Sequence, residues 1–569
     1  MRLFDSFVER FHRHFTRDSN ARAQLGVDRD LGELPDPTLT SQHSRTTEAK
    51  LLLRDSEAVT SDRLNAAEQL DLELAQLKLR EEVFHNSYTF NGRVASEQLP
   101  DAGEQIGDGL FTLFCADPRP AAERLSDMTS RIEKIPDFLE QTIQRIDTPV
   151  ARWRDMDLEC VSELPGFFDT LVAWAQQESW PDAARLQSAQ EQATTELRRY
   201  AKKLEQLDTT DQFHIGDEQA RTIVRLAGID LSFEQLHALA RNFLATTAET
   251  IEDCRTRVAE KHGLDADISA EELHQHLNSR YRVETNGKDF SVILHRYEQE
   301  QESICSFIEE LNLFPILDEQ DMRIMQTPDF MVPLIPAGAM TGPAAFREGV
   351  RVSQIFLTLT ADRVDDHTEL GIPLMMVHEG IPGHHLHLAT GRSHSSVVRR
   401  HSFASDQAEG WTTMLEDYML DIGYMEEAKD EARFCAKRDI SRIGARVAID
   451  LFFMTGDKGY LDVGVDSGPV ADDPFRAAAD LLKKVTGFSE ARAQAELNWY
   501  STQRGIPLSY LAGNKLMMDL KADITTHSAS QGISGLDLDR QFHGEFLRAG
   551  LMPIRFMRPI FQRAGLLPN

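Results

Sequence analysis

The stretch LMMVHEGIPGHHLH, residues 374–387, carries the strongest chemical signal in the chain. Four apolar residues lead into His378 and Glu379, and a Pro-Gly pair and further histidines follow. An apolar run that ends in a polar cluster predicts a buried helix whose polar end faces a cavity. Zinc peptidases bind their metal and supply a base with a His-Glu pair and a second His on one helix. Their usual spacing is HExxH, and here Pro382 stands where the second His would be.

The spacing of the histidines decides whether two of them can share one metal ion. Helical residues four apart lie on one face, about 6 Å apart along the axis. In a regular helix His384 would lie roughly 120° away from His378 with a rise of about 9 Å, and His385 would share its face at about 10.5 Å. Pro382 has no amide hydrogen and clashes with the preceding turn, so a π-type bulge could return His384 to His378. The alternative is that Pro382 and Gly383 end the helix and leave the histidines on a loop.

A catalytic zinc needs three protein ligands and an open position, so His378 and His384 require a third partner. Glu409 is the best candidate, because it lies near the start of a second predicted helix that could reach a metal held by the first. Gly410 permits close approach of the two helices, and Trp411 offers a wall for the substrate. Asp406 and Glu416 are also possible as the third ligand.

The remaining chemistry requires a base and a proton donor. Glu379 follows the first ligand directly, so it could take a proton from a metal-bound water. Tyr510 is a candidate donor to the oxyanion that forms on attack, and Tyr500 and His543 are the next candidates. Tyr500 and His543 are also expected to contact the substrate. Arg446, one turn after Arg442, could hold a substrate carboxylate. The plainer interpretation of these side chains is core packing, hydrogen-bond anchoring or a structural ion pair.

Composition limits the classes of partner. The 569 residues are 41% hydrophobic and 27% charged, which is ordinary for a soluble globular protein. The net charge of −31 argues against nucleic acid or an anionic membrane as partner, because both require clustered cations. The chain has no run of about 18 apolar residues, so no transmembrane helix is expected.

The cysteines and the N-terminal residues indicate the cellular compartment of the protein. The five cysteines are far apart and include no CxxC pair, which predicts free thiols and a reducing environment. The start, MRLFDSFVERFHRHF, has no uninterrupted apolar core, so it is not expected to be a signal peptide. Its apolar residues recur at helical spacing, which predicts a packed amphipathic helix over 1–17. A cytoplasmic location is therefore expected.

The organisation of the chain is helical around one candidate strand. Over residues 110–330, apolar residues recur at intervals of three and four, which predicts long helices. VRVSQIFLTLT, residues 350–360, is the best strand candidate. It could be an edge strand that pairs with an extended peptide, or an ordinary strand of a small sheet. We expect a helical N-terminal region, 1–330, and a catalytic region, 331–569, in one continuous unit.

Four motifs in order resemble the bacterial family catalogued as domain of unknown function 885. Its hallmarks are HExxPGHHxQ, an EGW helix, R-Y…P-G-Q-x-x-S-Y-x-x-G and a C-terminal FH…LxxG. This chain has HEGIPGHHLH, EGWTTMLEDYM, WYSTQRGIPLSYLAG and FHGEFLRAG. The resemblance covers about 340–569 and is weaker over the N-terminal part. The departures from the family pattern are His387, Met454, Trp499, Arg504 and Ile506.

The family is similar to helical glutamate-zincins of the oligopeptidase and angiotensin-converting-enzyme type. That resemblance implies His384 rather than His385 as the second ligand, Glu409 as the third, and Tyr510 in a catalytic role. It also implies a zincin-like fold with a deep central cleft, in addition to the mainly α architecture.

The predicted function is zinc-dependent hydrolysis of peptide bonds in short peptides, with Glu379 activating the water. Two further functions stay open: a metal- or peptide-binding member that lost catalysis, and a metallohydrolase of another amide or ester. The departures at Met454, Trp499 and Ile506 motivate the first of these two.

Overall fold

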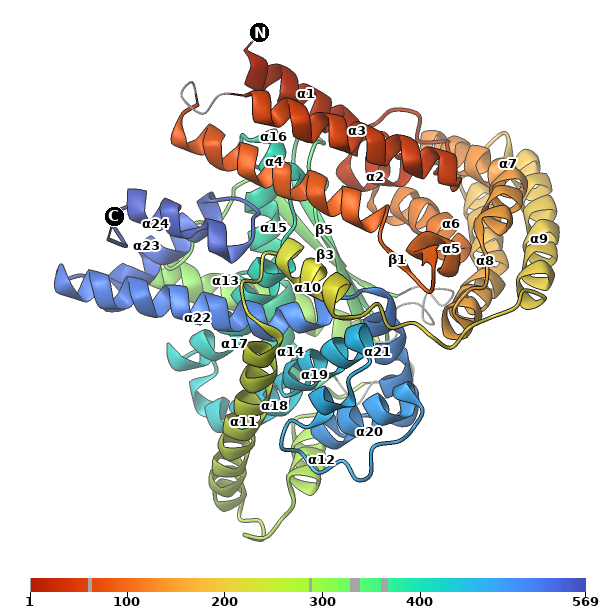
Figure 1. The fold of residues 1–569 in the computed structure, drawn as a ribbon. Helices are drawn as coiled ribbons and strands as arrows, with labels where there is room; N and C mark the ends of the chain where they lie inside the picture. Colours follow the sequence, from red (N-terminus) through yellow and green to blue (C-terminus); the bar gives the residue numbers. More distant parts are fainter. Residues whose placement is uncertain (1, 60–63, 286–288, 328–337, 360–366, 569) are drawn as a thin grey trace.

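The computed structural model describes residues 2–59, 64–285, 289–327, 338–359 and 367–568, and the chain is mainly α-helical (Figure 1). The expectation of a mainly α protein with a small β element is confirmed. No helix in the described ranges combines the length and the apolar character needed to cross a bilayer. All five cysteines lie in these ranges and are free, as predicted.

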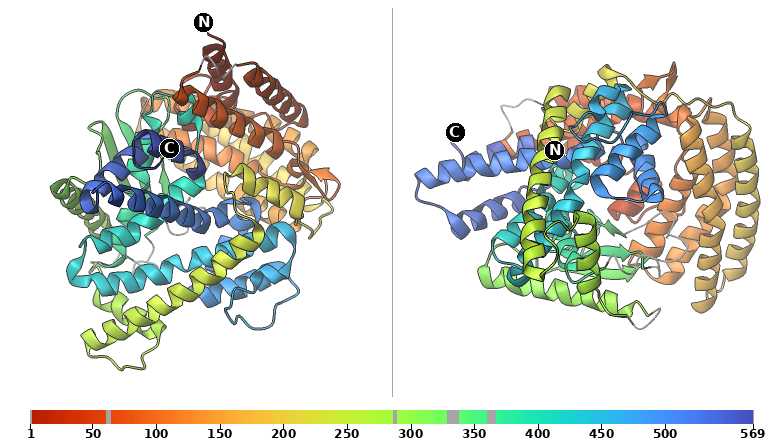
Figure 2. Two further views of the ribbon diagram at one scale, coloured as in Figure 1. Left: turned by 60° about the vertical axis from the view of Figure 1, so that its left-hand side comes forward. Right: turned by 90° about the horizontal axis from the view of Figure 1, so that it is seen from below.

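The first part of the chain forms a helical layer and a separate bundle. Its elements are α1 (Leu3–Phe15), α2 (Ser19–Leu25), α3 (Leu39–Ala58), α4 (Ala66–His85), β1 (Thr89–Phe90), β2 (Arg93–Val94), α5 (Ala95–Gln98), α6 (Ala102–Phe111), the π-helical turn η2 (Thr112–Ala116), α7 (Ala121–Arg145), α8 (Ala151–Gln177), α9 (Ala183–Glu205), α10 (Asp217–Leu226), α11 (Phe233–His262), α12 (Ala270–Arg280) and α13 (Ser291–Leu311). Helices α7, α8 and α9 share one apolar core and lie at the end of the molecule opposite the C-terminal helices (Figure 2).

The second part carries the sheet and the helices of the candidate site. Its elements are β3 (Gln320–Gln326), β4 (Gly338–Thr341), β5 (Arg351–Leu357), α14 (Gly371–Glu379), α15 (His384–Arg392), α16 (Val397–His401), α17 (Ser405–Asp421), η5 (Glu426–Ala428), α18 (Lys429–Ile440), α19 (Arg442–Thr455), η6 (Lys458–Leu461), α20 (Pro474–Thr486), α21 (Glu490–Thr502), α22 (Ile506–Ser530), α23 (Gly535–Arg548), η7 (Ile554–Phe556) and α24 (Arg558–Arg563).

The predicted strand lies in the middle of a three-stranded sheet. Strand β5 pairs in parallel with β3, from Gln320 opposite Arg351 to Gln326 opposite Leu357, and antiparallel with β4. Both of its hydrogen-bonding edges are therefore occupied. The expectation that this strand is a free edge for an extended peptide is wrong, and the strand is the centre of a small sheet. The last predicted strand residue, 360, lies outside the described ranges.

The two halves of the chain meet in shared cores. Helix α1 buries Phe4, Phe7 and Phe11 at helical spacing, which confirms the amphipathic helix predicted there. It docks on α16, where the Nδ1 atom of His12 lies 2.8 Å from the Nε2 atom of His401. The largest core cluster includes residues of α1, α14, α17 and α24, so residues on both sides of position 330 belong to it.

The closest helix crossing in the site region joins α17 and α22. A Cβ atom on Gly410 would lie 2.5 Å from the carbonyl oxygen of Gly513, and one on Gly513 would lie 2.2 Å from the carbonyl oxygen of Asp406. Side chains at these positions would force the helices apart. The prediction that Gly410 permits close approach is therefore confirmed.

We expect Gly410→Ala to lower the free energy of unfolding by about 1–3 kcal/mol, because the added methyl group overpacks the crossing. The matched control is Gly166→Ala in α8, where an added Cβ meets nothing within 4 Å and helix propensity should give a gain of up to about 1 kcal/mol. Urea unfolding of both variants provides the measurement. Equal free energies of unfolding for the two variants would contradict the close packing of α17 against α22.

Candidate metal centre

The Pro-Gly insertion divides the motif between two helices. Helix α14 ends at Glu379, the chain turns through 380–383 with a cis Ile381–Pro382 peptide bond, and α15 begins at His384. The π-type bulge within one helix is therefore wrong. The expectation of histidines on a loop is also wrong, because His384, His385 and His387 lie in the first turn of α15. A new helix starting beside the end of the old one places His384 where an unbroken helix could not.

The turn is held closely against the end of α14. A Cβ atom on Gly383 would lie 2.0 Å from the carbonyl oxygen of His378, so no side chain fits there. The indole Nε1 of Trp411 donates a hydrogen bond of 2.9 Å to the carbonyl oxygen of Pro382. Helix α17 thus fixes the path of the insertion from the other side.

Two imidazoles and two carboxylates converge at this break. The ligand atoms of His378, Glu379 and His384 lie within 4.8 Å of one another. The Oε2 atom of Glu409 lies 3.7 Å from Nε2 of His378 and 3.6 Å from Nε2 of His384. Donors around a tetrahedral zinc at 2.0–2.1 Å are separated by about 3.3 Å, so this set lies close to the spacing that such an ion requires.

The described side chains fit a metal ion in their chemistry as well. Oε2 of Glu409 is buried and has no hydrogen-bond partner among the described residues, which is costly unless a cation or water completes it. Burial raises the pKa of Glu409, but the imidazoles of His384 and His378 outweigh this effect and lower it. Glu379 is half-buried and directly follows His378. Glu409 therefore remains the candidate third ligand, and Glu379, whose ligand atom lies in the same cluster as the two imidazoles, remains the candidate for proton transfer.

His378 is oriented by a second carboxylate. Its Nδ1 atom lies 2.7 Å from Oε1 of Glu416, so its Nε2 atom remains available for the candidate metal ion. Burial lowers the pKa of His378, but the hydrogen bond with Glu416 and the nearby Glu379 and Glu409 raise it to about 9. Metal-binding histidines commonly donate their other ring nitrogen to such a carboxylate. Glu416, a possible third ligand from sequence, therefore supports the first ligand instead.

Glu416→Gln is expected to weaken zinc binding about 10- to 100-fold, because the amide orients and polarises His378 less well than the carboxylate. Competition with a chromogenic zinc chelator gives the affinity. Glu426→Gln, at an exposed acidic residue of η5, is the control and should leave the affinity unchanged. Equal affinities of the two variants would exclude this role for Glu416.

The other candidate ligands, Asp406, His385 and His387, contact other parts of the fold. Asp406 is fully buried, and its Oδ2 atom accepts a hydrogen bond of 2.9 Å from the amide of Ile554. Its burial raises the pKa of the carboxyl to about 7. The Nδ1 atom of His385 lies 2.7 Å from the hydroxyl of Ser353 on β5, so this ring faces the sheet. His387 is buried against Phe546. The arrangement therefore favours His384 as the second ligand.

Tyr510, on helix α22, lies beside the candidate ligand Glu409. Burial, and after it the charge of Glu409, raises the pKa of Tyr510 well above its usual value, so the hydroxyl keeps its proton. The guanidinium of Arg446 lies over the Tyr510 ring, 4.4 Å from its centroid. The helix start is held by Asp450, whose carboxylate accepts from the amides of Gly505 and Leu508. These contacts place a phenolic donor next to the candidate ion.

Arg446 is already paired. Its Nε donates to the Tyr500 hydroxyl at 2.9 Å, and its Nη2 donates to Glu496 at 3.0 Å. The Tyr500 hydroxyl donates in turn to Glu496 at 2.7 Å, and Tyr500 is fully buried. Arg446 therefore forms the structural ion pair that is the plainer interpretation of this residue, in a network beside Tyr510. The expectation that Tyr500 binds substrate is corrected, because its side chain reaches no surface.

Trp411 and His543 lie in the core. Trp411 is fully buried and stacks on Phe546 with ring centroids 4.4 Å apart. His543 is also fully buried, stacks on Phe314 and lies 3.1 Å from the carbonyl oxygen of Leu313. The expectation that these two side chains contact a substrate is corrected, because neither reaches a surface. Trp411, expected as a wall for the substrate, and His543, expected as a donor, both serve core packing instead.

Of the residues that depart from the family pattern, some lie in the core and one lies near the candidate site. Met454 is buried, and its carbonyl oxygen accepts from the amide of Ile215. Arg504 donates to the Tyr88 hydroxyl and the Phe213 carbonyl oxygen. Trp499 lies next to Tyr510, with ring centroids 6.4 Å apart. Of these three, only Trp499 lies close enough to Tyr510 to alter the site directly.

Comparison with known proteins shows the family and the fold. The sequence profile of a family described as bacterial protein of unknown function (DUF885) matches residues 20–559. No curated protein matches. A structure described as "a putative lipoprotein of unknown function" from Shewanella oneidensis has a TM-score of 0.74 at 15% identity, covering 98% of this chain and 99% of the other. A "putative lipoprotein" from Colwellia psychrerythraea has a TM-score of 0.79 at 13% identity, with 99% of each chain covered. At these identities the likeness concerns the fold alone.

Proposed function

This chain belongs to DUF885, a family of bacterial proteins of unknown function, and from its side chains we propose a zinc-dependent peptidase that hydrolyses short peptides. The observation that supports the proposal most is the convergence of His378, His384 and Glu409, with a further carboxylate, Glu379, in the same cluster. Two imidazoles and one carboxylate are the ligand set of many catalytic zinc sites, which keep a further position open. A zincin-like fold with a substrate cleft is part of this proposal.

Each protein group has a distinct task in the proposed reaction. Zinc, when bound, supplies a Lewis acid that polarises a carbonyl oxygen and acidifies water. The Glu379 carboxylate takes the proton of the attacking water and passes it to the leaving amine. The Tyr510 hydroxyl, which stays protonated at neutral pH, donates to the oxygen on which negative charge develops. Glu416 holds the His378 ring, and Arg446 with Glu496 holds Tyr510.

The partners and location follow from the same proposal. A short peptide is the proposed substrate, while the strongly acidic chain does not favour nucleic acid or an anionic membrane. The free cysteines favour the cytoplasm as the proposed location. The two structural neighbours are described as putative lipoproteins, which favours a location outside the cytoplasm. Cell fractionation followed by immunodetection distinguishes the two.

Metal analysis combined with peptide cleavage tests the proposal. Protein purified without chelator should contain about one zinc ion per chain and should cleave members of a fluorogenic panel of short peptides. Added chelator should stop cleavage, and zinc should restore it. Absence of stoichiometric metal would overturn the proposal. Zinc and peptide binding without cleavage would favour a non-catalytic binding protein, and cleavage of non-peptide amides or esters alone would favour a different metallohydrolase.

A further inference from the structure

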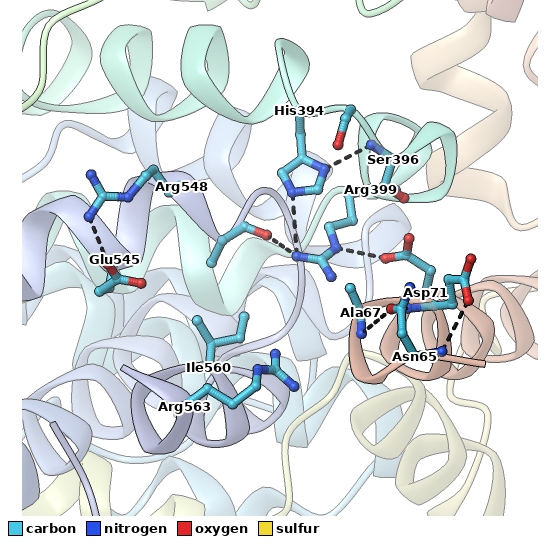
Figure 3. A pocket seen from close by; sticks show the side chains of 13 residues that line it. Asn65, Ala67, Asp71, His394, Ser396, Arg399, Glu545, Arg548, Ile560 and Arg563 are labelled. Carbon is cyan, nitrogen blue, oxygen red and sulfur yellow. Dashed lines mark hydrogen bonds and ion pairs between the residues drawn. The ribbon is translucent and has the colours of Figure 1, made fainter. Parts of the chain in front are cut away.

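A second hollow lies beyond the far end of the helix that carries His384. It has a volume of about 480 Å³, opens to the surface, and is lined by the start of α4, the segment from α15 to α16, and helices α23 and α24 (Figure 3). This volume is in the range of small-molecule sites. Helix α15 is about 13 Å long, so the hollow is distinct from the candidate metal centre. Ala67, Ala549 and Ile560 provide apolar surface in its lining.

The charges that line the hollow leave one cation unpaired. Asp71 accepts from Nε of Arg399 at 2.7 Å, and Glu545 accepts from Arg548 at 2.7 Å. The remaining acid of the lining, Glu68, pairs with Arg2 at 2.7 Å. Arg563 is exposed at the edge of the hollow and has no ion-pair partner in the part of the chain that the structure describes.

A conflict between hydrogen-bond donors lies deeper in the same hollow. The amide of Ser396 donates to Nδ1 of His394 at 2.9 Å, so the hydrogen of the neutral ring belongs on Nε2. That Nε2 atom faces Nη1 of Arg399 at 3.5 Å (Figure 3). Nη1 already donates to the carbonyl oxygen of Ala549 at 2.7 Å, and its second hydrogen faces the ring. Two donors that face each other lack a common acceptor.

We propose that this hollow binds a small molecule through a phosphate or carboxylate group, which His394 and Arg399 hold inside and Arg563 holds at the edge. An oxyanion accepts from both facing donors and resolves their conflict. Arg399 suits this role because its side chain is only 6% exposed and is fixed by Asp71. The apolar surface of Ile560 and Ala67 receives the rest of the ligand. This inference does not depend on the proposed peptidase activity.

Calorimetric titration of the purified full-length chain with inorganic phosphate tests the site, against chloride at equal ionic strength. We expect saturable binding, weakened about 10- to 100-fold in Arg563→Gln and in His394→Ala, since each removes one hydrogen bond to a charged group. Arg198→Gln, at an exposed arginine of α9, is the matched control and should bind like the unmodified chain. Arg563 is exposed, so its replacement leaves the fold intact.

Two outcomes would overturn the site. One is the absence of saturable phosphate binding at millimolar concentrations. The other is binding that Arg563→Gln and His394→Ala both leave unchanged, which would place the phosphate elsewhere, including on a metal ion. Saturable titration with a short dicarboxylate in place of phosphate, weakened by the same variants, would identify the preferred group as a carboxylate.

Discussion

Glu379→Gln is expected to retain about one zinc ion per chain and to lose roughly 10²- to 10⁴-fold in kcat, the usual contribution of a general base. The amide is nearly isosteric with the carboxylate but cannot accept a proton from water. Glu379 is not assigned to the ligand set, since Glu409 lies 3.6 and 3.7 Å from the two imidazoles. Retention of zinc together with loss of turnover would therefore identify Glu379 as the general base.

The measurement is kcat with the best substrate of the peptide panel, beside zinc content by elemental analysis. Glu310→Gln, at an exposed residue of α13, serves as control and should leave both values unchanged. If Glu379→Gln lost its zinc instead, Glu379 would be a ligand. If it kept full activity, the base would have to be another group.

His384→Ala is expected to lose stoichiometric zinc, whereas His385→Ala keeps it. These adjacent histidines face different partners, since His384 points its Nε2 at Glu409 and His385 bonds to Ser353. Removal of a direct ligand should weaken zinc binding by more than the roughly 100-fold that loss of an outer partner can cost. His385→Ala should instead lower the free energy of unfolding by about 1–3 kcal/mol, because a buried hydrogen bond is lost.

Zinc titration and urea unfolding of both variants separate these effects. His385→Gln is a milder companion, because its amide can still bond to Ser353 and the fold should be kept. Loss of zinc from His385→Gln with retention in His384→Ala would reverse the assignment of the ligands. Loss from neither would mean that the imidazoles do not bind the ion.

The sequence predicted the side chains of the site better than their backbone path. The position of Glu379 next to His378 is read directly from the sequence, and Gly410 marks the close helix approach that brings Glu409 near the histidines. The choice of Glu409 over Asp406 and Glu416 rests mainly on the resemblance to the family's EGW helix. The break at 380–383 could not be predicted, because local sequence shows only that Pro382 lacks a donor. The path of the turn depends on Trp411, a residue of another helix.

Side-chain roles were harder to predict where partners lie far apart in the sequence. Glu416 supports His378 across 38 positions, and Arg446 meets Tyr500 across 54. An isolated helical Glu or Arg carries no local mark of such a partner. Aromatic identity likewise does not say whether a ring faces a cavity or the core, and Trp411, predicted as a wall for the substrate, lies in the core.

The docking of the first helix on α16 has a consequence for biosynthesis. His12 meets His401, which is translated 389 residues later. At about 5–20 residues per second, α1 leaves the ribosome roughly 20–80 s before its partner exists. During this interval α1 can pack on α3, another of its partners, but the part of its face that meets His401, at Phe11 and Phe15, stays uncovered. A chaperone that binds nascent chains is therefore expected to be captured at this end of α1 in stalled-ribosome profiling.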